Sequence, residues 1–72
     1  MKEYTNSQIS ALIDEHIHSA RDRDILKLRF IGGYTYDVIS EKIYDIHKIP
    51  ISPRQISSII SRDSIILDKH LK

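Results

Sequence analysis

The stretch ISPRQISSIISR, residues 51–62, decides how the rest of the chain is interpreted. Ser52 followed by Pro53 predicts a helix start, because serine caps free backbone N–H groups and proline has no N–H to leave unsatisfied at the first helical position. The isoleucines that follow have the three-and-four spacing of a buried helix face: Ile56, Ile59 and Ile60. The other face is short, polar and lightly basic: Arg54, Gln55, Ser57, Ser58, Ser61 and Arg62.

The isoleucine content of the whole chain would ordinarily favour strands. The sequence has 15 isoleucines and 2 alanines, and β-branched side chains lose rotamer freedom in a helix. Spacing nevertheless favours a helix in the last third, since its apolar positions mix odd and even numbers and would bury both faces of a strand. These positions are Ile56, Ile59, Ile60, Ile66, Leu67 and Leu71. We therefore expect an all-α fold.

Three more helices are expected before this stretch, which makes a small bundle of about four helices. Their predicted ranges are 6–17, 20–31, 36–47 and 53–70. A chain of 72 residues has room for one domain. We therefore assign residues 1–72 to a single domain.

Caps and apolar stripes support each of these helices. The predicted caps are one of residues 5–7 for the first helix, then Ser19 and Thr35, and Gly32-Gly33 ends the second helix. The first helix has the stripe Ile9, Leu12, Ile13 and Ile17. The third has Val38, Ile39, Ile43 and Ile46, which we expect to be buried.

Composition excludes several classes of protein. There is no cysteine, which excludes disulfides and thiolate metal sites and fits a reducing compartment. The start MKEYTNSQIS has no apolar run behind its charges, and no segment approaches the ~20 apolar residues of a membrane span. We expect a cytoplasmic protein that does not contact membranes.

Charge is distributed unevenly along the chain, although the formal net charge is only +1. Residues 1–24 carry three basic and five acidic side chains, residues 25–52 four and three, and residues 53–72 four and two. An anionic partner should therefore meet the C-terminal third.

A longer stretch carries a resemblance to a known family. RDRDILKLRFIGGYTYDVISEKI, residues 21–43, is similar to the start of the region 4 fold of bacterial sigma factors and of the sigma-region-4-like regulators of phages and prophages. The matching positions are Arg21 to Asp24, Leu26, Arg29, Phe30, Gly33, Thr35, Tyr36, Asp37, Ile39, Glu41 and Ile43, followed by Ile51, Ser52, Ile56 and Ile59. The resemblance covers roughly residues 20–62 and implies a helix-turn-helix formed by the last two predicted helices.

One departure from the family lies between Ile43 and Ile51. YDIHKIP, residues 44–50, stands where the family usually has a single glycine, so the chain is about six residues longer here. Either the third helix continues through Ile46, or the turn is an extended loop. The fold expected is thus a helix-turn-helix with an extended turn.

The resemblance implies that helix 53–62 enters the major groove of double-stranded DNA. Arg54 and Gln55 are the predicted base-reading residues, since arginine can bond guanine and glutamine can bond adenine with two hydrogen bonds. Ser57, Ser58 and Ser61 are short enough to allow close approach, and Arg62 is expected on a phosphate.

Further phosphate contacts are expected outside this helix. Thr35 and Tyr36 resemble the family's usual phosphate contacts at the start of the third helix, and Lys48, with Lys42, is a candidate on charge alone. The plain alternative is that the serines form an ordinary solvated face and the lysines only aid solubility.

Other chemistry is not expected. The four histidines lack the i, i+4 spacing of a helical zinc site, and there is neither a glycine-rich phosphate loop nor a setting for a nucleophile. We expect no metal, no cofactor and no enzymatic activity. Tyr34, Tyr36 and Tyr44 are interpreted as packing residues rather than as base-stacking platforms.

The function predicted is a sequence-specific DNA-binding transcription regulator of a phage or mobile element. Its expected partners are double-stranded DNA, RNA polymerase and a second copy of the chain. The apolar tail or the stripe of the first helix would supply the dimer surface, the tail candidates being Ile65, Ile66, Leu67 and Leu71. Two alternatives remain open: a protein-interaction module of helix-turn-helix descent, and the DNA-recognition part of a packaging protein.

Overall fold

The computed structural model describes residues 4–70 and confirms the all-α bundle. Its helices are α1 Asn6–His16, α2 Ala20–Phe30, α3 Tyr36–His47 and α4 Pro53–Asp68, and no strand occurs within residues 4–70. The starts are those predicted. The ends of α1, α2 and α4 lie one or two residues earlier than predicted.

Each helix begins where a side chain caps it. Thr5 and Ser52 form capping boxes with Gln8 and Gln55, in which side chain and backbone bond reciprocally. Ser19 accepts from the backbone N–H of Asp22, and Thr35 accepts from that of Val38. These bonds satisfy N–H groups that a helix leaves free, which is why the polar residues before each apolar run determine the helix starts.

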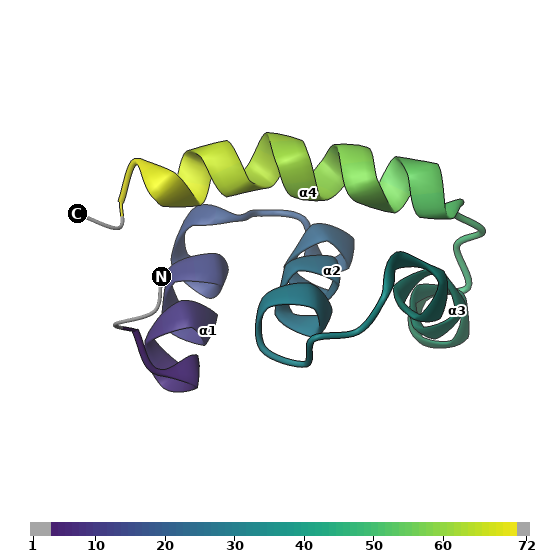
Figure 1. The fold of residues 1–72 in the computed structure, drawn as a ribbon, viewed down its shortest axis with the longest axis horizontal. Helices are drawn as coiled ribbons and strands as arrows, with labels where there is room; N and C mark the ends of the chain where they lie inside the picture. The colour runs from purple at the N-terminus through teal and green to yellow at the C-terminus, as the bar shows by residue number, and fades with distance from the viewer. Residues whose placement is uncertain (1–3, 71–72) are drawn as a thin grey trace.

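The longest helix lies across the other three. Figure 1 shows α4 running along the long axis of the molecule, with α1, α2 and α3 side by side beneath it, and α4 contacts all three. The apolar stripe of α4 therefore closes the core along its whole length.

The core is built mainly from isoleucine. Its buried residues come from all four helices and from the segments after α1 and before α4: Ile9, Ile13, Ile17, Ile25, Leu26, Ile39, Ile43, Ile51, Ile56, Ile59, Ile60 and Leu67. Tertiary packing of this stripe thus overrides the modest helix propensity of β-branched residues.

Two predictions about apolar residues are wrong. Ile46 was expected in the buried stripe of α3 but is 59% exposed, because it borders an open hollow beside Leu28 and Ile31 of the α2 region instead of being covered. Leu67 was expected on a dimer surface but is 2% exposed, because it packs into the core of its own chain.

The other candidates for a dimer surface differ in their exposure. Ile9, Ile13 and Ile17 of the first stripe are buried in the bundle and are not free to contact another chain. Ile65 and Ile66 are exposed. Leu71 lies outside the residues that the structure describes.

The glycine pair ends α2 as predicted, and each glycine has its own reason. Gly33 has φ +71°, a conformation that glycine adopts without strain. A Cβ on Gly32 would lie 2.6 Å from the Tyr34 ring and 2.9 Å from the Leu28 carbonyl oxygen. The backbone N–H of Tyr34 donates to that same Leu28 oxygen at 3.2 Å, so the turn is tightly closed.

The long connection after Ile43 is mainly helix. α3 continues through Ile46 to His47 and ends at Lys48 in the left-handed conformation, with φ 57°. His47 Nε2 lies 2.6 Å from Asp24 Oδ2, and the Ser40 hydroxyl donates to the Ile51 carbonyl. The first of the two alternatives therefore holds, and the segment between α3 and α4 is only residues 48–52.

Candidate nucleic-acid interface

The polar face of α4 lies on the outside of the bundle. Ile56, Ile59 and Ile60 face the core, so the polar residues on the opposite side of α4 project outward. Arg54, Gln55, Ser58, Ser61 and Arg62 are exposed and Ser57 is half-buried. Short side chains over most of this face leave the helix backbone accessible to a large partner.

Arg54 stands at the second position of α4 and is free to bind. No hydrogen bond or ion pair joins its guanidinium to another residue in the range 4–70. Its five donors are therefore available to an acceptor pair such as O6 and N7 of guanine.

Gln55 is partly occupied. Its Oε1 accepts from the Ser52 backbone N–H at 2.9 Å, while its own N–H donates to Ser52 Oγ at 3.2 Å. A two-bond contact with adenine needs both the oxygen and the amide nitrogen of the side chain. Gln55 would therefore have to give up or share its capping bond to read a base in this way.

Arg62 has partners that the sequence analysis did not foresee. Its Nη2 donates to Asp22 Oδ2 at 2.8 Å and its Nε to Asp63 Oδ1 at 3.2 Å, and these carboxylates raise the pKa of Arg62. The signal for Asp63 was present, since this position continues the three-and-four spacing of the buried stripe of α4.

The start of α3 lies against the same part of α4. Thr35 is exposed and accepts the N–H of Val38 at 3.4 Å, which leaves its hydroxyl proton free. Tyr36 is half-buried, and the Arg29 guanidinium carbon lies 4.7 Å from the centre of its ring. Arg29 Nη1 also donates to the Tyr34 carbonyl at 3.0 Å, so the cation is held in place over the aromatic face.

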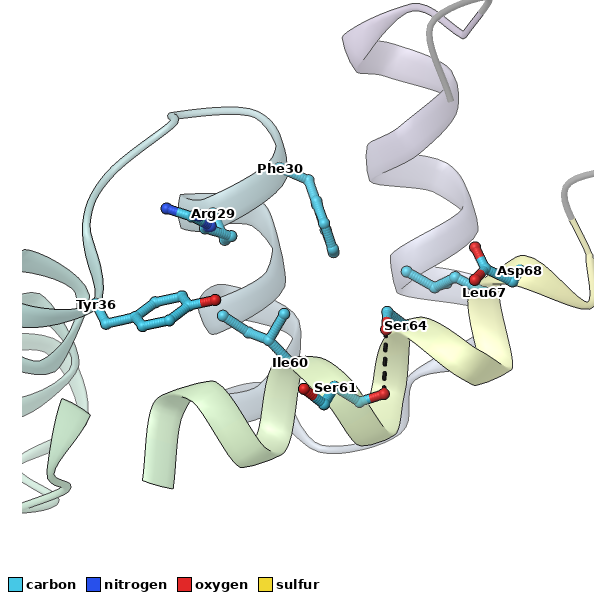
Figure 2. Close-up of a pocket in the computed structure, with 8 residues that line it drawn as sticks. All are labelled: Arg29, Phe30, Tyr36, Ile60, Ser61, Ser64, Leu67 and Asp68. Atoms are coloured by element: carbon cyan, nitrogen blue, oxygen red, sulfur yellow. Dashed lines mark hydrogen bonds between the residues drawn. The ribbon is translucent and has the colours of Figure 1, made fainter. Parts of the chain in front are cut away.

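A pocket of about 380 Å³ joins these residues. Figure 2 shows Arg29 and Phe30 of α2, Tyr36 at the start of α3, and one side of α4 around it. The lining residues are Arg29, Phe30, Tyr36, Ile60, Ser61, Ser64, Leu67 and Asp68. The pocket therefore brings together two predicted site residues, Tyr36 and Ser61.

Arg29 is the site candidate that sequence reasoning overlooked. In the sequence, Arg29 matches only the segment before the glycine turn, and its position at the end of α2 does not indicate a place beside α4. The contact depends on how α2 packs under α4, which spacing within one helix cannot predict. Asp68 places an acid at the same pocket.

Lys48 lies apart from Thr35 and Tyr36. It follows the last residue of α3, whereas they stand at its beginning. A helix of 12 residues is about 18 Å long, so these three predicted phosphate contacts belong to two separate places on the surface.

The tyrosines do not behave alike. Tyr36 packs against the core, as predicted. Tyr34 is 40% exposed and has the Lys42 ammonium 4.9 Å from the centre of its ring, and Tyr44 is 53% exposed. The packing interpretation is therefore right for Tyr36 and wrong for Tyr44.

Within residues 4–70, no group of three or more histidine, aspartate or glutamate side chains lies close enough to hold a metal ion. His16 stacks on His70, with ring centroids 3.7 Å apart and planes 6° apart. Over the same residues, no helix combines the length and hydropathy that a membrane span requires.

Comparison with known proteins found no match: no family model, curated protein or solved structure is similar to this chain. The function proposed below therefore rests on the chain's own residues and on the motif resemblance.

Proposed function

We propose that the protein is a sequence-specific DNA-binding transcription regulator, in which α3 and α4 form a helix-turn-helix and α4 lies in the major groove. The observation that carries this proposal is the exposed, unpaired Arg54 beside a row of short serines on α4. A helix with this surface can approach base edges closely, because none of the exposed side chains from Arg54 to Arg62 is a carboxylate.

The start of α3 supports the same orientation. Thr35 and Tyr36 offer hydroxyls at a helix N-terminus, where free N–H groups favour an anion. Arg29, held over the Tyr36 ring, adds a fixed positive charge beside Ser61 of α4. A DNA phosphate at this pocket would lie next to the helix that reads the bases.

The biological setting follows from the resemblance to sigma region 4. We propose a cytoplasmic regulator of a phage or mobile element that acts on transcription with RNA polymerase. One such module covers about 600–1,000 Å² of its own surface on DNA. Two copies on paired half-sites would provide the affinity that one module lacks.

Selection of bound sites from random duplex DNA tests the proposal, followed by affinity measurements on the selected site at several salt concentrations. We expect Arg54→Ala to weaken binding by about 1–3 kcal/mol and to relax the base preference at one position. Lys69→Ala removes an exposed charge just after α4 and serves as the control that keeps the preference. Absence of salt-dependent binding to every duplex would refute the proposal.

A second candidate is a protein-interaction module, and one observation favours it. A hollow of about 350 Å³ has no lining residue from α4. It is lined by Asp24, Lys27, Leu28, Ile31, Gly32 and Ile46. Ile46→Ser would abolish binding of such a partner and leave DNA affinity unchanged. If the same variant lost DNA affinity, the hollow would instead be needed for the structure that binds DNA, and the protein-interaction candidate would lose its support.

A further inference from the structure

Two carboxyl groups are buried together between α2 and α4. Asp22 is 5% exposed and Asp63 is 4% exposed, and they are the buried charged residues within the described chain. Arg62 bridges them, donating to Asp22 Oδ2 at 2.8 Å and to Asp63 Oδ1 at 3.2 Å. We call Asp22, Arg62 and Asp63 the carboxyl latch, since they link the first turn of α2 to the middle of α4.

One carboxyl oxygen of the latch has no hydrogen-bond donor beside it. Asp63 Oδ2 is buried and has no hydrogen-bond partner. A bare carboxylate oxygen in a core loses its water without compensation. A proton on Oδ2 removes the charge and makes this atom a donor. Burial raises the pKa of Asp63, and so does the hydrogen bond that its protonated form can make with Asp22.

Charged groups elsewhere on the packed helices have partners of their own, and Arg21 holds Asp22. On α2, Arg21 Nη2 lies 3.0 Å from Asp22 Oδ1. At the end of α1, His16 stacks on His70. On α3, His47 pairs with Asp24 and Lys42 lies over Tyr34. Arg62 is therefore the cation that compensates the negative charge of Asp63.

Arg62 can leave the latch. Its side chain is 63% exposed although both of its partners are buried, so the guanidinium sits at the surface end of the cluster. It also stands on the exposed face of α4 that holds Arg54 and Ser58. An anion on that face competes with the two carboxylates for the same guanidinium.

We propose that the carboxyl latch holds either the Arg62 guanidinium or an additional proton, so that an anion drawing Arg62 away is bound together with a proton. The proton comes from solvent and forms an O–H bond on Asp63 Oδ2, directed at the Asp22 carboxylate. This inference rests on the proposed function in one respect: the competing anion is taken to be a DNA phosphate.

Proton uptake on binding has a definite sign. By linkage, a ligand that raises the proton affinity of a group binds more tightly as pH falls. One coupled proton changes affinity by at most about tenfold per pH unit. DNA affinity of the protein therefore rises on acidification, over a window that lies above the ordinary carboxyl pKa of 3.8.

The first test needs no DNA. The Asp63 carboxyl carbon is followed by NMR through a pH titration in wild type, Arg62→Gln and Arg54→Gln. We expect Arg62→Gln to raise the Asp63 midpoint by about one unit or more, since a nearby opposite charge lowers a carboxyl pKa by about 1–3 units. Arg54→Gln removes the same charge from an exposed site on α4 and leaves the midpoint unchanged.

An unchanged or lowered midpoint in Arg62→Gln overturns the latch. If that variant does not fold, Arg62→Lys replaces it, because lysine keeps the charge but cannot bond both carboxylates with a planar fork. A smaller shift of the same sign is then expected. A midpoint equal to that of wild type would count equally against the proposal.

The second test measures duplex affinity between pH 5 and pH 7.5. Wild type should bind more tightly as pH falls, and Asp63→Asn should show a flat profile. Asp45→Asn, which removes an acid from an exposed position of α3, should shift every affinity alike and keep the slope. A flat wild-type profile overturns the coupling. Absence of duplex binding refutes the proposed function, while the NMR titration still decides the latch.

Discussion

Asp63 lowers the stability of the fold, because its Oδ2 is buried without a hydrogen-bond partner. Asp63→Asn supplies an amide donor at that place and resembles the protonated acid. We expect the variant to gain about 1 kcal/mol in free energy of unfolding at pH 7, the usual scale for relieving a buried unsatisfied group. Asp22→Asn is the contrasting variant and should lose stability, because Asp22 holds both Arg21 and Arg62.

The pH dependence of that gain follows from the raised pKa of Asp63. A carboxyl whose pKa is higher in the folded than in the unfolded state contributes stability below its unfolded value of 3.8. This contribution is lost as pH rises through the folded value. The stability difference between Asp63→Asn and wild type should therefore widen from pH 4 to pH 7 in urea titrations. A difference that narrows over this range would contradict the assignment.

Lys48 illustrates a different kind of residue effect, since it is a non-glycine residue with φ 57° at the end of α3. Lys48→Gly should stabilise the protein by about 0.5–1 kcal/mol in thermal or urea unfolding, because glycine adopts this conformation without a Cβ clash. Lys48→Ala keeps a Cβ and should give no gain. If Lys48 contacts a phosphate, both variants lose the same DNA affinity, so backbone and charge effects separate cleanly.

At the scale of the element, the proposed function requires α4 to combine a helix start with a reading surface, and Gln55 is a candidate for both. It closes the capping box with Ser52 and faces outward as a base-reading candidate. Gln55→Glu separates the two uses, because glutamate also forms a capping box but repels phosphates and cannot donate to adenine N7. We expect an unfolding free energy within about 0.5 kcal/mol of wild type and a clear loss of duplex affinity.

The control for this variant is Ser52→Ala, which removes the other half of the box. It should cost about 1 kcal/mol of stability, as loss of an N-cap does, and leave duplex affinity nearly unchanged once the protein is fully folded. If Gln55→Glu were to unfold the protein while binding of the folded fraction persisted, Gln55 would be a capping residue only.

At the scale of the whole molecule, local rules predicted most of the fold and less of the site. Caps and stripes lie within one helix, so Ser52, Thr35 and the isoleucines of α4 indicated their own elements correctly. Ile46 and Leu67 were misjudged because burial depends on which neighbour covers a position. The contacts of Arg29 with Tyr36 and of Arg62 with Asp22 depend on packing between helices and therefore left no signal in spacing alone. The burial of Asp63, by contrast, follows the spacing of the α4 stripe.

The net charge of the protein is only +1, so we expect few phosphate contacts and a weak dependence of DNA affinity on salt concentration. Each phosphate neutralised by a cation contributes about −0.9 to the slope of log affinity against log salt, whereas hydroxyls such as those of Thr35 and Tyr36 contribute nothing. With Arg29, Lys48 and Arg62 as phosphate contacts, one copy should show a slope near −3. Lys48→Ala and Arg29→Ala should each reduce its magnitude by about one, and Lys69→Ala should leave it unchanged. A slope that none of these substitutions alters would place the phosphates on another face of the bundle.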